Sequence, residues 1–499
     1  MNSSEDKELG IKGWLSGKVP KAKSQESKTA PVVLDKHRIA VLPFVNMSPD
    51  PNDEYFADGM TEEIISTVSG ISGLNVISRT SVMGYKGTTK KVEEIGRELK
   101  AGSVLEGSFR KAGNRIRVTT QLIDVAADKH LWAQNYDRNL DDIFAIQSDV
   151  AKQVAEALRS QILSREKERV EKRPTESTIA YAFYLKGRFF WNKRGVKNIE
   201  KAIEYFELAV HEDPSFALGY VGQADCSLVL ANWGVDIEAN LRKAKAMATK
   251  AIELDPGLAE ALTTIALVLD NEHELRQAEE HCKKAIELKP SYSTARQWYF
   301  NLLLNQLKWG EALEQIEKAV ELDPLSPVIN YNLGIYYFAK REYSRAIELF
   351  KRVIDLDPSY PPVHVELVVT YGILKMFDDM KREATTVVEL LKGTYPVVQT
   401  LMNCLVARYE DDKETVRRLI PDVEAHINEP GHTASFLASF HFYLGENAKG
   451  LKFMELAYSK GEDISGVRWN PDLDNVRTDP RYLDLLKKLG LDQTAQPTS

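Results

Sequence analysis

Hydrophobic and polar residues alternate in two different ways along the chain. Between His37 and about Gln161, short apolar runs such as IAVLPF and LNVIS stand between helical segments, and residues 103–137 alternate with period two. Alternation with period two is typical of strands that bury one face. From about Ser177 onward, apolar residues recur every three or four positions, as in amphipathic helices. The pattern therefore predicts an α/β amino-terminal domain followed by an all-α segment.

The period-two segment predicts a run of antiparallel strands. Its central strand places Ile116, Val118, Thr120 and Leu122 on one face, with turns expected at Gly113-Asn114 and between Ala126 and Lys129. TEEIISTVSGI and KKVEEIGRELKA are expected to be helices, as is QSDVAKQVAEALRSQI with Ser148 as its N-cap. The charged stretch SREKERVEKRPTES then links this domain to the helical segment.

Regularly spaced prolines indicate an internal repeat in the helical segment. The prolines stand at positions 214, 256, 290, 324 and 358, and the last three intervals are 34 residues each. A period of 34 residues is the signature of the tetratricopeptide repeat, a helix–turn–helix unit. Each proline follows a helix that it cannot continue. The segment is therefore expected to be a tetratricopeptide-repeat solenoid.

The repeat also predicts where paired helices touch, because close contact requires small residues. The small positions are filled by Ala202 and Ala209, Ala244 and Ala251, Ala278 and Ala285, Ala312 and Ala319, and Ala346 and Val353. Beyond Pro358 the match decays, with Met380 in a small position. At the end, Asp479 is expected to cap a terminal helix that starts at Pro480 and shows Leu483, Leu486 and Leu489 on one face.

These patterns divide the chain into seven parts. They are a disordered tail (1–36), an α/β domain (37–164), a charged helical linker (165–176), five repeats (177–360), degenerate repeats (361–460), a carboxyl-terminal capping segment (461–491) and a tail (492–499). A stacked array needs atypical terminal units to cover its open ends.

Several motifs of the amino-terminal domain resemble a known family. IAVLPFVNMS, EYFADGMTEEI, LNVISRTSV, SVLEGSFRKAGNRIRVTTQLID and HLWAQNYDR together resemble the TolB amino-terminal-like domain. In bacterial and archaeal regulators this domain is followed by tetratricopeptide repeats and stands downstream of a nucleotide cyclase, a winged-helix domain or a protein kinase. The residues before the first strand are too few for any of these. The resemblance thus implies a non-catalytic regulator whose output domain is absent or is encoded as a separate chain.

The stretch IAVLPFVNMSPDPNDEYFADG has the strand–loop–helix shape of many phosphate sites. It lacks the glycines and lysine of a P-loop, and no Lys or Arg occurs from Ile39 to Ser78. An EF-hand starting at Asp50 would require Gly and Glu where Tyr55 and Thr61 stand. The acidic residues are instead expected to serve the helix start: Asp58 or Thr61 caps it, and Glu62 and Glu63 complement its dipole.

Other candidate chemistry is sparse. The three cysteines are far apart, and His426, His432 and His441 match no metal-binding spacing, so no catalytic residue, cofactor or metal is predicted. A net charge of -8 argues against a nucleic-acid partner. No apolar run is long enough for a signal peptide or a membrane span, which predicts a cytoplasmic protein without membrane attachment.

The remaining functional candidate is the concave surface of the repeats. First helices of stacked units line such a surface, and grooves of this kind hold partner segments. The residues expected to face it are Thr263, Asp270, Gln297, Asn301, Asn305, Tyr331 and Phe338. The leading hypothesis is a non-enzymatic scaffold or sensor that binds a protein or peptide there. The alternatives are the regulatory half of a nucleotide cyclase or kinase acting in trans, and an envelope-assembly accessory.

Overall fold

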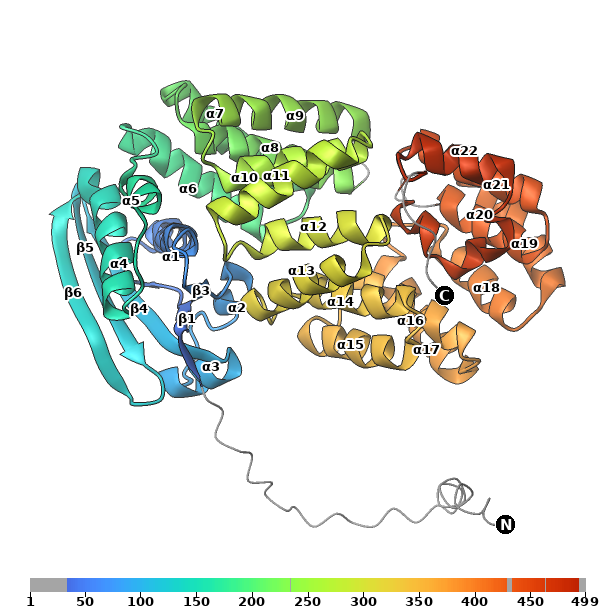
Figure 1. Cartoon of the computed structure of the whole chain (residues 1–499), viewed down its shortest axis with the longest axis horizontal. Helices are drawn as coiled ribbons and strands as arrows, with labels where there is room; N and C mark the ends of the chain where they lie inside the picture. The colour runs from blue at the N-terminus through green and yellow to red at the C-terminus, as the bar shows by residue number, and fades with distance from the viewer. Residues whose placement is uncertain (1–33, 234, 429–432, 463, 493–499) are drawn as a thin grey trace, which may run out of the picture. The chain divides into compact units, whose positions relative to one another are not determined.

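The structure is a computed structural model that describes residues 34–233, 235–428, 433–462 and 464–492. Its strands are β1 (Asp35–Val41), β2 (Val45–Asn46), β3 (Asn75–Val76), β4 (Ala101–Ala112), β5 (Arg115–Asp124) and β6 (Lys129–Asn139). They form one mixed sheet in the order β3-β1-β4-β5-β6, and β2 pairs with β4 (Figure 1). β1 is parallel to its neighbours, whereas β4, β5 and β6 are successive antiparallel strands.

The sheet is covered by helices on one face. As predicted, Ile116, Val118, Thr120 and Leu122 are at most 1% exposed, whereas the alternating Arg115 and Arg117 are exposed. The covering helices are α1 (Glu54–Ser69) and α4 (Ile143–Ala157), which pack against each other. The shorter helices of this region are α2 (Arg79–Met83), α3 (Val92–Glu98) and α5 (Ser164–Glu171).

Helix α1 starts earlier than predicted. Because it begins at Glu54, the residues expected to cap it or complement its dipole lie inside it; these are Asp58, Thr61, Glu62 and Glu63. Asp58 pairs with Lys86, with 2.6 Å between Oδ1 and Nζ, and the Thr61 hydroxyl accepts a hydrogen bond from the Phe44 amide. The buried Phe56 extends the apolar face upstream, which explains the earlier start.

Helix α4 also starts before its predicted cap. It begins at Ile143, and the Ser148 hydroxyl donates to the Val170 carbonyl instead of capping the helix. Ile143 and Phe144 are buried and anchor the additional turn.

Paired helices make up the rest of the chain, as the repeat predicts. The pairs are α6 (Thr178–Lys193) with α7 (Val196–Glu212), α8 (Ala217–Asn232) with α9 (Ile237–Leu254), α10 (Ala259–Asn271) with α11 (Leu275–Leu288), α12 (Ser293–Asn305) with α13 (Trp309–Leu322), α14 (Pro327–Ala339) with α15 (Tyr343–Leu356), α16 (Pro361–Ile373) with α17 (Phe377–Leu391), α18 (Val398–Tyr409) with α19 (Lys413–Ala425), and α20 (Thr433–Tyr443) with α21 (Asn447–Ser459). The fold is therefore an α/β region plus an all-α solenoid.

The turn between the two helices of a unit repeats its backbone conformation. Left-handed residues with φ between 58° and 63° stand at positions 273, 307, 341 and 375, each 34 residues after the last. Asp411 and Gly445 continue the series where the sequence match has decayed. A left-handed residue is a common way to end a helix. The turn geometry thus persists into the degenerate units.

Small residues occupy the predicted contacts between paired helices. All the alanines of the predicted pairs, and Val353, are at most 1% exposed. Gly334 in α14 is equally constrained, because a Cβ there would lie 2.6 Å from Cδ1 of Phe350 in α15. Close packing of α14 on α15 therefore depends on the missing side chain.

The carboxyl-terminal segment contains two 3-10 helices, η3 (Ser465–Arg468) and η4 (Pro471–Val476), and helix α22 (Pro480–Lys488). Asp479 caps α22 by accepting a hydrogen bond from the Arg481 amide, as predicted. Of the predicted apolar face, Leu489 is buried and Leu486 packs against the same core, but Leu483 is 51% exposed, and Tyr482 and Leu485 are buried instead. These buried residues share a core with Leu451 and Met454 of α21.

Candidate partner-binding groove

The first helices of the units, from α6 to α20, form the surface that we call the groove. Of the predicted groove residues, Gln297, Asn301 and Asn305 lie on α12 and are half-buried. Asn301 Oδ1 accepts a hydrogen bond from Asn332 Nδ2 on α14 at 3.3 Å. Asp270, near the end of α10, is also half-buried. These polar side chains remain partly accessible along the groove.

Two predicted groove residues are buried. Thr263 and Phe338 are each 3% exposed, which corrects the expectation that they present themselves to a partner. The Thr263 hydroxyl donates to the Ala259 carbonyl within α10 at 2.8 Å. The Phe338 ring lies against Tyr343 and Trp469. The first helix of a unit contacts other helices on several sides. The position of a residue in the 34-residue repeat therefore does not show whether its side chain remains accessible to a partner.

Tyr331 and Glu366 connect two neighbouring first helices. The Tyr331 hydroxyl lies 3.4 Å from Glu366 Oε1 on α16, and its ring meets that of Tyr360 edge-on at 5.7 Å. Burial, together with a smaller effect of the nearby Asp472 carboxylate, raises the pKa of Glu366 to about 7 against the lowering effect of the Tyr331 hydrogen bond.

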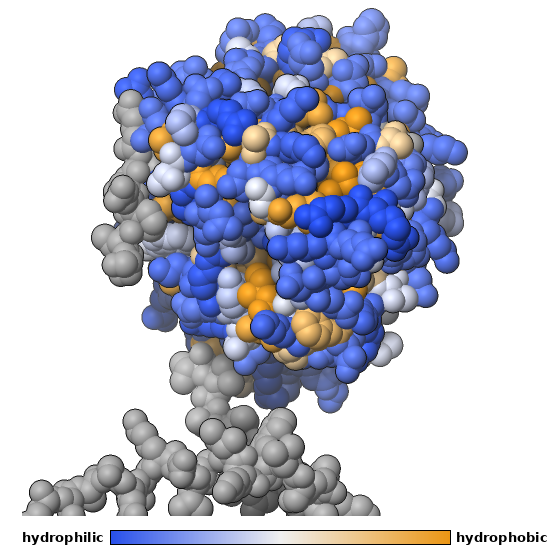
Figure 2. All heavy atoms as spheres, turned by 90° about the vertical axis from the view of Figure 1, so that its right-hand side faces the viewer, coloured by the Kyte–Doolittle hydropathy of each residue, from blue (hydrophilic) through white to orange (hydrophobic). Residues whose placement is uncertain are grey.

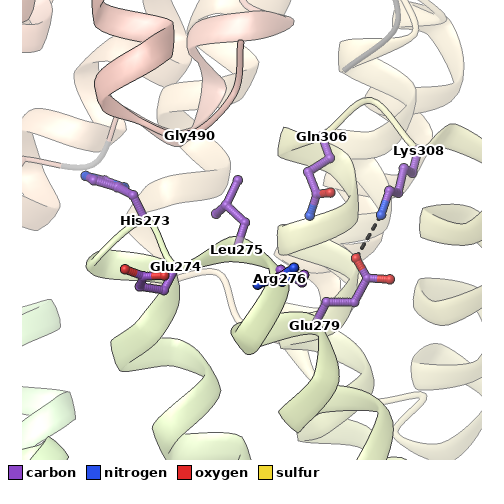
Figure 3. A pocket seen from close by; sticks show the side chains of 8 residues that line it. All are labelled: His273, Glu274, Leu275, Arg276, Glu279, Gln306, Lys308 and Gly490. Carbon is purple, nitrogen blue, oxygen red and sulfur yellow. Dashed lines mark hydrogen bonds and ion pairs between the residues drawn. The ribbon is translucent and has the colours of Figure 1, made fainter. Parts of the chain in front are cut away.

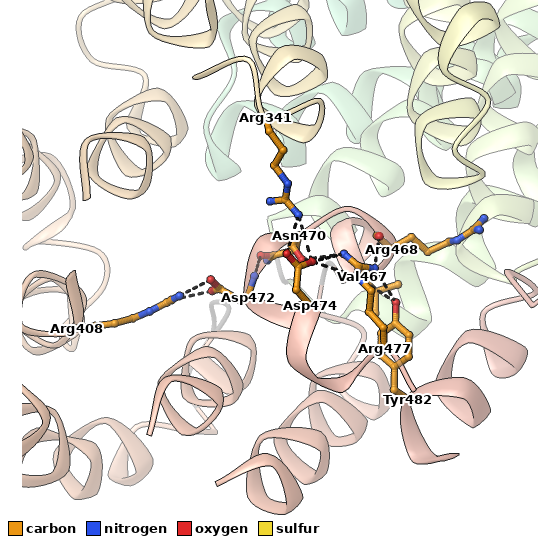
Figure 4. A network of polar contacts seen from close by, with 9 residues as sticks. All are labelled: Arg341, Arg408, Val467, Arg468, Asn470, Asp472, Asp474, Arg477 and Tyr482. Atoms are coloured by element: carbon orange, nitrogen blue, oxygen red, sulfur yellow. Dashed lines mark hydrogen bonds and ion pairs between the residues drawn. The ribbon is translucent and has the colours of Figure 1, made fainter. Parts of the chain in front are cut away.

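A segment of the chain itself lies across the groove. Residues 466–474, the crossing segment, include most of η3 and the first part of η4. They place Asp472 against α18 and α20 (Figure 4). Arg408 of α18 binds both carboxylate oxygens of Asp472, and its Nη1 atom lies 2.7 Å from Oδ2. The Ser439 hydroxyl of α20 donates to the same Oδ2 at 2.7 Å. Burial alone would raise the pKa of Asp472, but Arg408 and Ser439 hold it below its usual value.

Further contacts attach the crossing segment to α14. Arg341, in the turn after α14, lies 3.2 Å from Asp474 Oδ1. The Trp469 ring meets the Phe338 ring edge-on, with 6.4 Å between centroids. Sequence reasoning missed Arg341, Arg408 and the crossing segment, because the segment was interpreted only as part of a cap. Its aromatic and acidic composition was the available signal.

The other end of the groove is covered by helix α1. Glu62 on α1 receives Arg188 of α6, with 2.7 Å between Oε1 and Nε, and Arg79 at 3.1 Å. Arg188 also lies 3.3 Å from Asp225 of α8. Burial raises the pKa of Glu62, but the two arginines together hold it below its usual value. Glu62 of α1 therefore serves a contact with the repeats.

Glu63 is the counterpart of Glu62 on the same turn of α1. Burial raises its pKa to about 7, and the adjacent Glu62 charge adds to this effect. The Tyr184 hydroxyl lies 3.3 Å from Glu63 Oε1. Nearby, Lys289 pairs with Glu260 of α10 and lies 2.8 Å from the Ser66 hydroxyl. One polar cluster thus joins α1 to α6, α8 and α10.

Loops between units also hold the sheet. The Ser291 hydroxyl, before α12, donates to the Leu74 carbonyl at 2.8 Å and accepts from the Val76 amide of β3 at 3.1 Å. Asp323, before α14, accepts a hydrogen bond from the Ser81 hydroxyl at 2.6 Å. Burial raises the pKa of Asp323 to about 6.

A hollow of about 450 Å³ lies at the turn between α10 and α11 (Figure 3). It is lined by His273, Glu274, Leu275, Arg276, Glu279, Gln306, Lys308 and Gly490. Glu279 pairs with Lys308 at 2.8 Å across it. Because its charges are of both signs and two of them are already paired, the hollow does not favour an anion.

The candidate metal ligands are not grouped. Among the residues that the structure describes, no three His, Cys, Asp or Glu side chains converge as metal ligands would. His441 Nδ1 lies 3.0 Å from Glu446, and His426 Nδ1 contacts the Asp422 carbonyl; His432 lies outside the described residues. Cys226, Cys282 and Cys404 are buried free thiols.

The surface around the carboxyl-terminal units is mainly hydrophilic. Figure 2 shows this face with apolar side chains gathered in several separate areas between hydrophilic ones. Within the described ranges, no helix combines the length and the hydrophobicity needed to cross a membrane.

Comparisons with known proteins identify the repeats. Tetratricopeptide-repeat family models match residues 259–292 and 300–361. The chain contains tetratricopeptide repeats. A third model, described as the second domain of HilA/YgeH-like transcriptional regulators, matches residues 35–153. That description differs from the TolB amino-terminal-like domain, so the TolB assignment stays a prediction.

A curated relative matches half of the chain. It is the putative adenylate cyclase 3 of Rhizobium meliloti (strain 1021), which is 37% identical over 257 residues, covering 50% of this chain and 44% of the relative. Solved structures that match part of the chain include PilF of Pseudomonas aeruginosa, at 22% identity and a TM-score of 0.34, covering 42% of this chain and 93% of that chain. The type IV pilus biogenesis factor PilW matches at 19% identity and a TM-score of 0.35, covering 41% and 94%.

Proposed function

We propose that this chain is a non-enzymatic interaction protein, a scaffold or sensor whose repeat groove binds a segment of a partner protein. Tetratricopeptide-repeat matches support a role in protein–protein interaction. The observation that carries the proposal is the contact of Arg408 with Asp472, in which a groove side chain holds another segment of this chain through specific polar contacts. The accessible amides of Gln297, Asn301 and Asn305 would extend such recognition.

Affinity capture with the full chain tests this proposal. The double variant Asn301→Ala/Tyr331→Ala should lose the captured partner by about tenfold or more, as expected for groove contacts worth above 1.4 kcal/mol. The matched control is Glu348→Ala/Lys351→Ala, which changes two exposed residues of α15 and should retain the partner. Both variants should first show wild-type thermal unfolding. Failure to capture a specific partner, or unchanged capture by the groove variant, would count against the proposal.

The amino-terminal region supplies a second element of this proposal. We propose residues 37–164 as a TolB amino-terminal-like domain that serves as a docking or sensing unit, on the basis of its motifs. The charged composition of residues 165–176 favours a linker, and the decayed repeat pattern of residues 361–460 favours degenerate repeats. The region is held to the repeats by Ser291 and the Arg188–Glu62 pair, so a signal sensed there has a direct path to the groove.

A second candidate function is regulation of a separately encoded nucleotide cyclase or kinase. The 37% identity to a putative adenylate cyclase favours it. The test is the activity of a separately encoded catalytic domain, measured with and without this chain. A change of about tenfold would support regulation in trans. Turnover of ATP by the purified chain alone would refute the non-enzymatic proposal.

A further inference from the structure

The crossing segment divides its side chains between two different environments. Val467 and Leu473 are at most 3% exposed and belong to the core formed by α21 and α22. Trp469 instead packs with the core of the inner repeats, near Phe338. One set of residues therefore folds the carboxyl-terminal cap, and the other contacts the groove without contributing to the core of the cap.

The groove contacts combine one aromatic residue with two carboxylates. Trp469 lies against Phe338 of α14, and Asp472 binds Arg408 of α18 (Figure 4). Asp474 lies 3.2 Å from Arg341 and also pairs with Arg477 of its own segment at 2.7 Å. Relative to the aromatic residue, the carboxylates stand three and five positions later. The receiving arginines come from units that are separated by one intervening unit, so the recognition surface extends over several first helices.

The internal segment leaves part of this surface unsatisfied. Arg341 Nη1 and the Tyr409 hydroxyl are buried without a hydrogen-bond partner among the described residues. Buried donors without acceptors cost free energy. An external segment that supplied an acceptor to Arg341 Nη1 would regain part of that cost.

We propose that the groove recognises a partner segment with an aromatic residue followed by carboxylates three and five positions later, and that Trp469, Asp472 and Asp474 occupy this site until such a partner displaces them. This inference rests on the proposed function and names the partner class and the regulation of the same site. Charge complementarity with Arg341 and Arg408 selects an acidic protein segment.

A labelled peptide with the sequence of residues 466–476 tests the inference by fluorescence polarisation. The full chain carrying Trp469→Ala, Asp472→Asn and Asp474→Asn should bind the peptide about tenfold more tightly than wild type, because its own segment no longer competes. Adding Arg408→Gln should abolish that gain. A peptide with both aspartates replaced by asparagine should bind about tenfold more weakly. Rising salt concentration should weaken the binding of the acidic peptide but not that of the asparagine peptide.

Equal binding by wild type and the triple variant, or binding that survives Arg408→Gln, would overturn the inference. If the triple variant fails to show wild-type thermal unfolding, Asp474→Asn alone serves as the second variant, since that aspartate is 53% exposed. It should then bind the peptide several-fold more tightly than wild type, and unchanged binding would be decisive against displacement. Capture of a cellular partner is measured separately, so the proposed function and this inference can fail independently.

Discussion

Replacement of Arg188 by methionine should destabilise the junction between α1 and the repeats. Arg188 is 16% exposed and lies between Glu62, which is 14% exposed, and Asp225, which is 20% exposed. Methionine keeps much of the apolar stem but removes the positive charge. Both carboxylates would then lose their shared cation in a largely dry environment.

The expected loss follows from the partners that remain. Removing one member of a buried ion pair typically costs about 3–5 kcal/mol. Glu62 keeps Arg79 at 3.1 Å and Asn192 at 3.0 Å, and Asp225 keeps the Thr264 hydroxyl at 2.9 Å. Because these contacts remain, we expect the loss in the free energy of unfolding at the lower end of that range, about 3 kcal/mol. Combining Arg188→Met with Asp225→Asn should recover about 1–2 kcal/mol, because the carboxylate that is left without a paired cation is removed.

Urea unfolding followed by tryptophan fluorescence and circular dichroism measures this loss, since urea leaves ion pairs unscreened. Trp191 is a suitable reporter because the Arg188 guanidinium lies 4.3 Å from its ring centroid. The control Arg242→Met removes an exposed pair with Glu238 and should change stability by less than about 0.5 kcal/mol. A loss below about 1 kcal/mol for Arg188→Met, or additive single and double variants, would refute the reasoning about the buried cluster.

Three further predictions address packing, pH and the loops. Gly334→Ala should lower the free energy of unfolding in urea by about 1–3 kcal/mol, because the new Cβ would meet the Phe350 ring. The control Gly310→Ala has nothing within 4 Å of its Cβ and should be neutral or stabilising by up to about 1 kcal/mol. If Gly310→Ala destabilised the chain more than Gly334→Ala, the packing argument would be contradicted. The pKa of Glu63 is raised by burial to about 7 in the folded chain, so its stabilising effect is complete below about pH 4.5 and is lost as pH rises through 7. Glu63→Gln should therefore flatten the dependence of stability on pH between 5 and 8 by about 2–3 kcal/mol, and an unchanged slope would exclude this assignment. Ser291→Ala should cost about 1–3 kcal/mol and speed hydrogen exchange at the Val76 amide, since that amide loses its acceptor; unaltered exchange would mean that the loop does not hold β3.

The repeats could be predicted because their packing depends on residue size at a fixed period. Ala312 and Ala319 are buried where the 34-residue frame places them. The later units were harder to recognise because their signals are weaker, not because their structure is different. Met380 fills a small position and is fully buried, and the left-handed turn residues there are Lys375 and Asp411, which carry no glycine signature. The backbone conformation of the turns is thus repeated more regularly along the solenoid than the residue types that adopt it.

The contacts of the groove could not be predicted in the same way. A helix period shows which face a residue shares, but it does not identify a partner 126 positions away, as Arg188 is from Glu62. The acidic start of α1 was therefore assigned to a local role, helix capping, when tertiary packing uses it for ion pairs. The burial of Phe338 could not be predicted for the same reason. Its ring packs against Trp469, which lies 131 positions later in the sequence.

The two ends of the groove differ in how they are closed, and this difference determines where exchange with a partner is feasible. At the α1 end, Leu185 and Phe206 of the first unit share one uninterrupted apolar core with Met60 and with the sheet. Separating them would expose that core to water at about 25 cal/mol per Å² of apolar surface. At the other end, the crossing segment contacts Phe338 and Arg341 of the α14 unit, Arg408 of α18 and Ser439 of α20, and its apolar anchors remain within the cap. A competing segment with its own aromatic residue and carboxylates would replace those contacts and keep Phe338 covered, so we expect exchange with a partner at the carboxyl-terminal end.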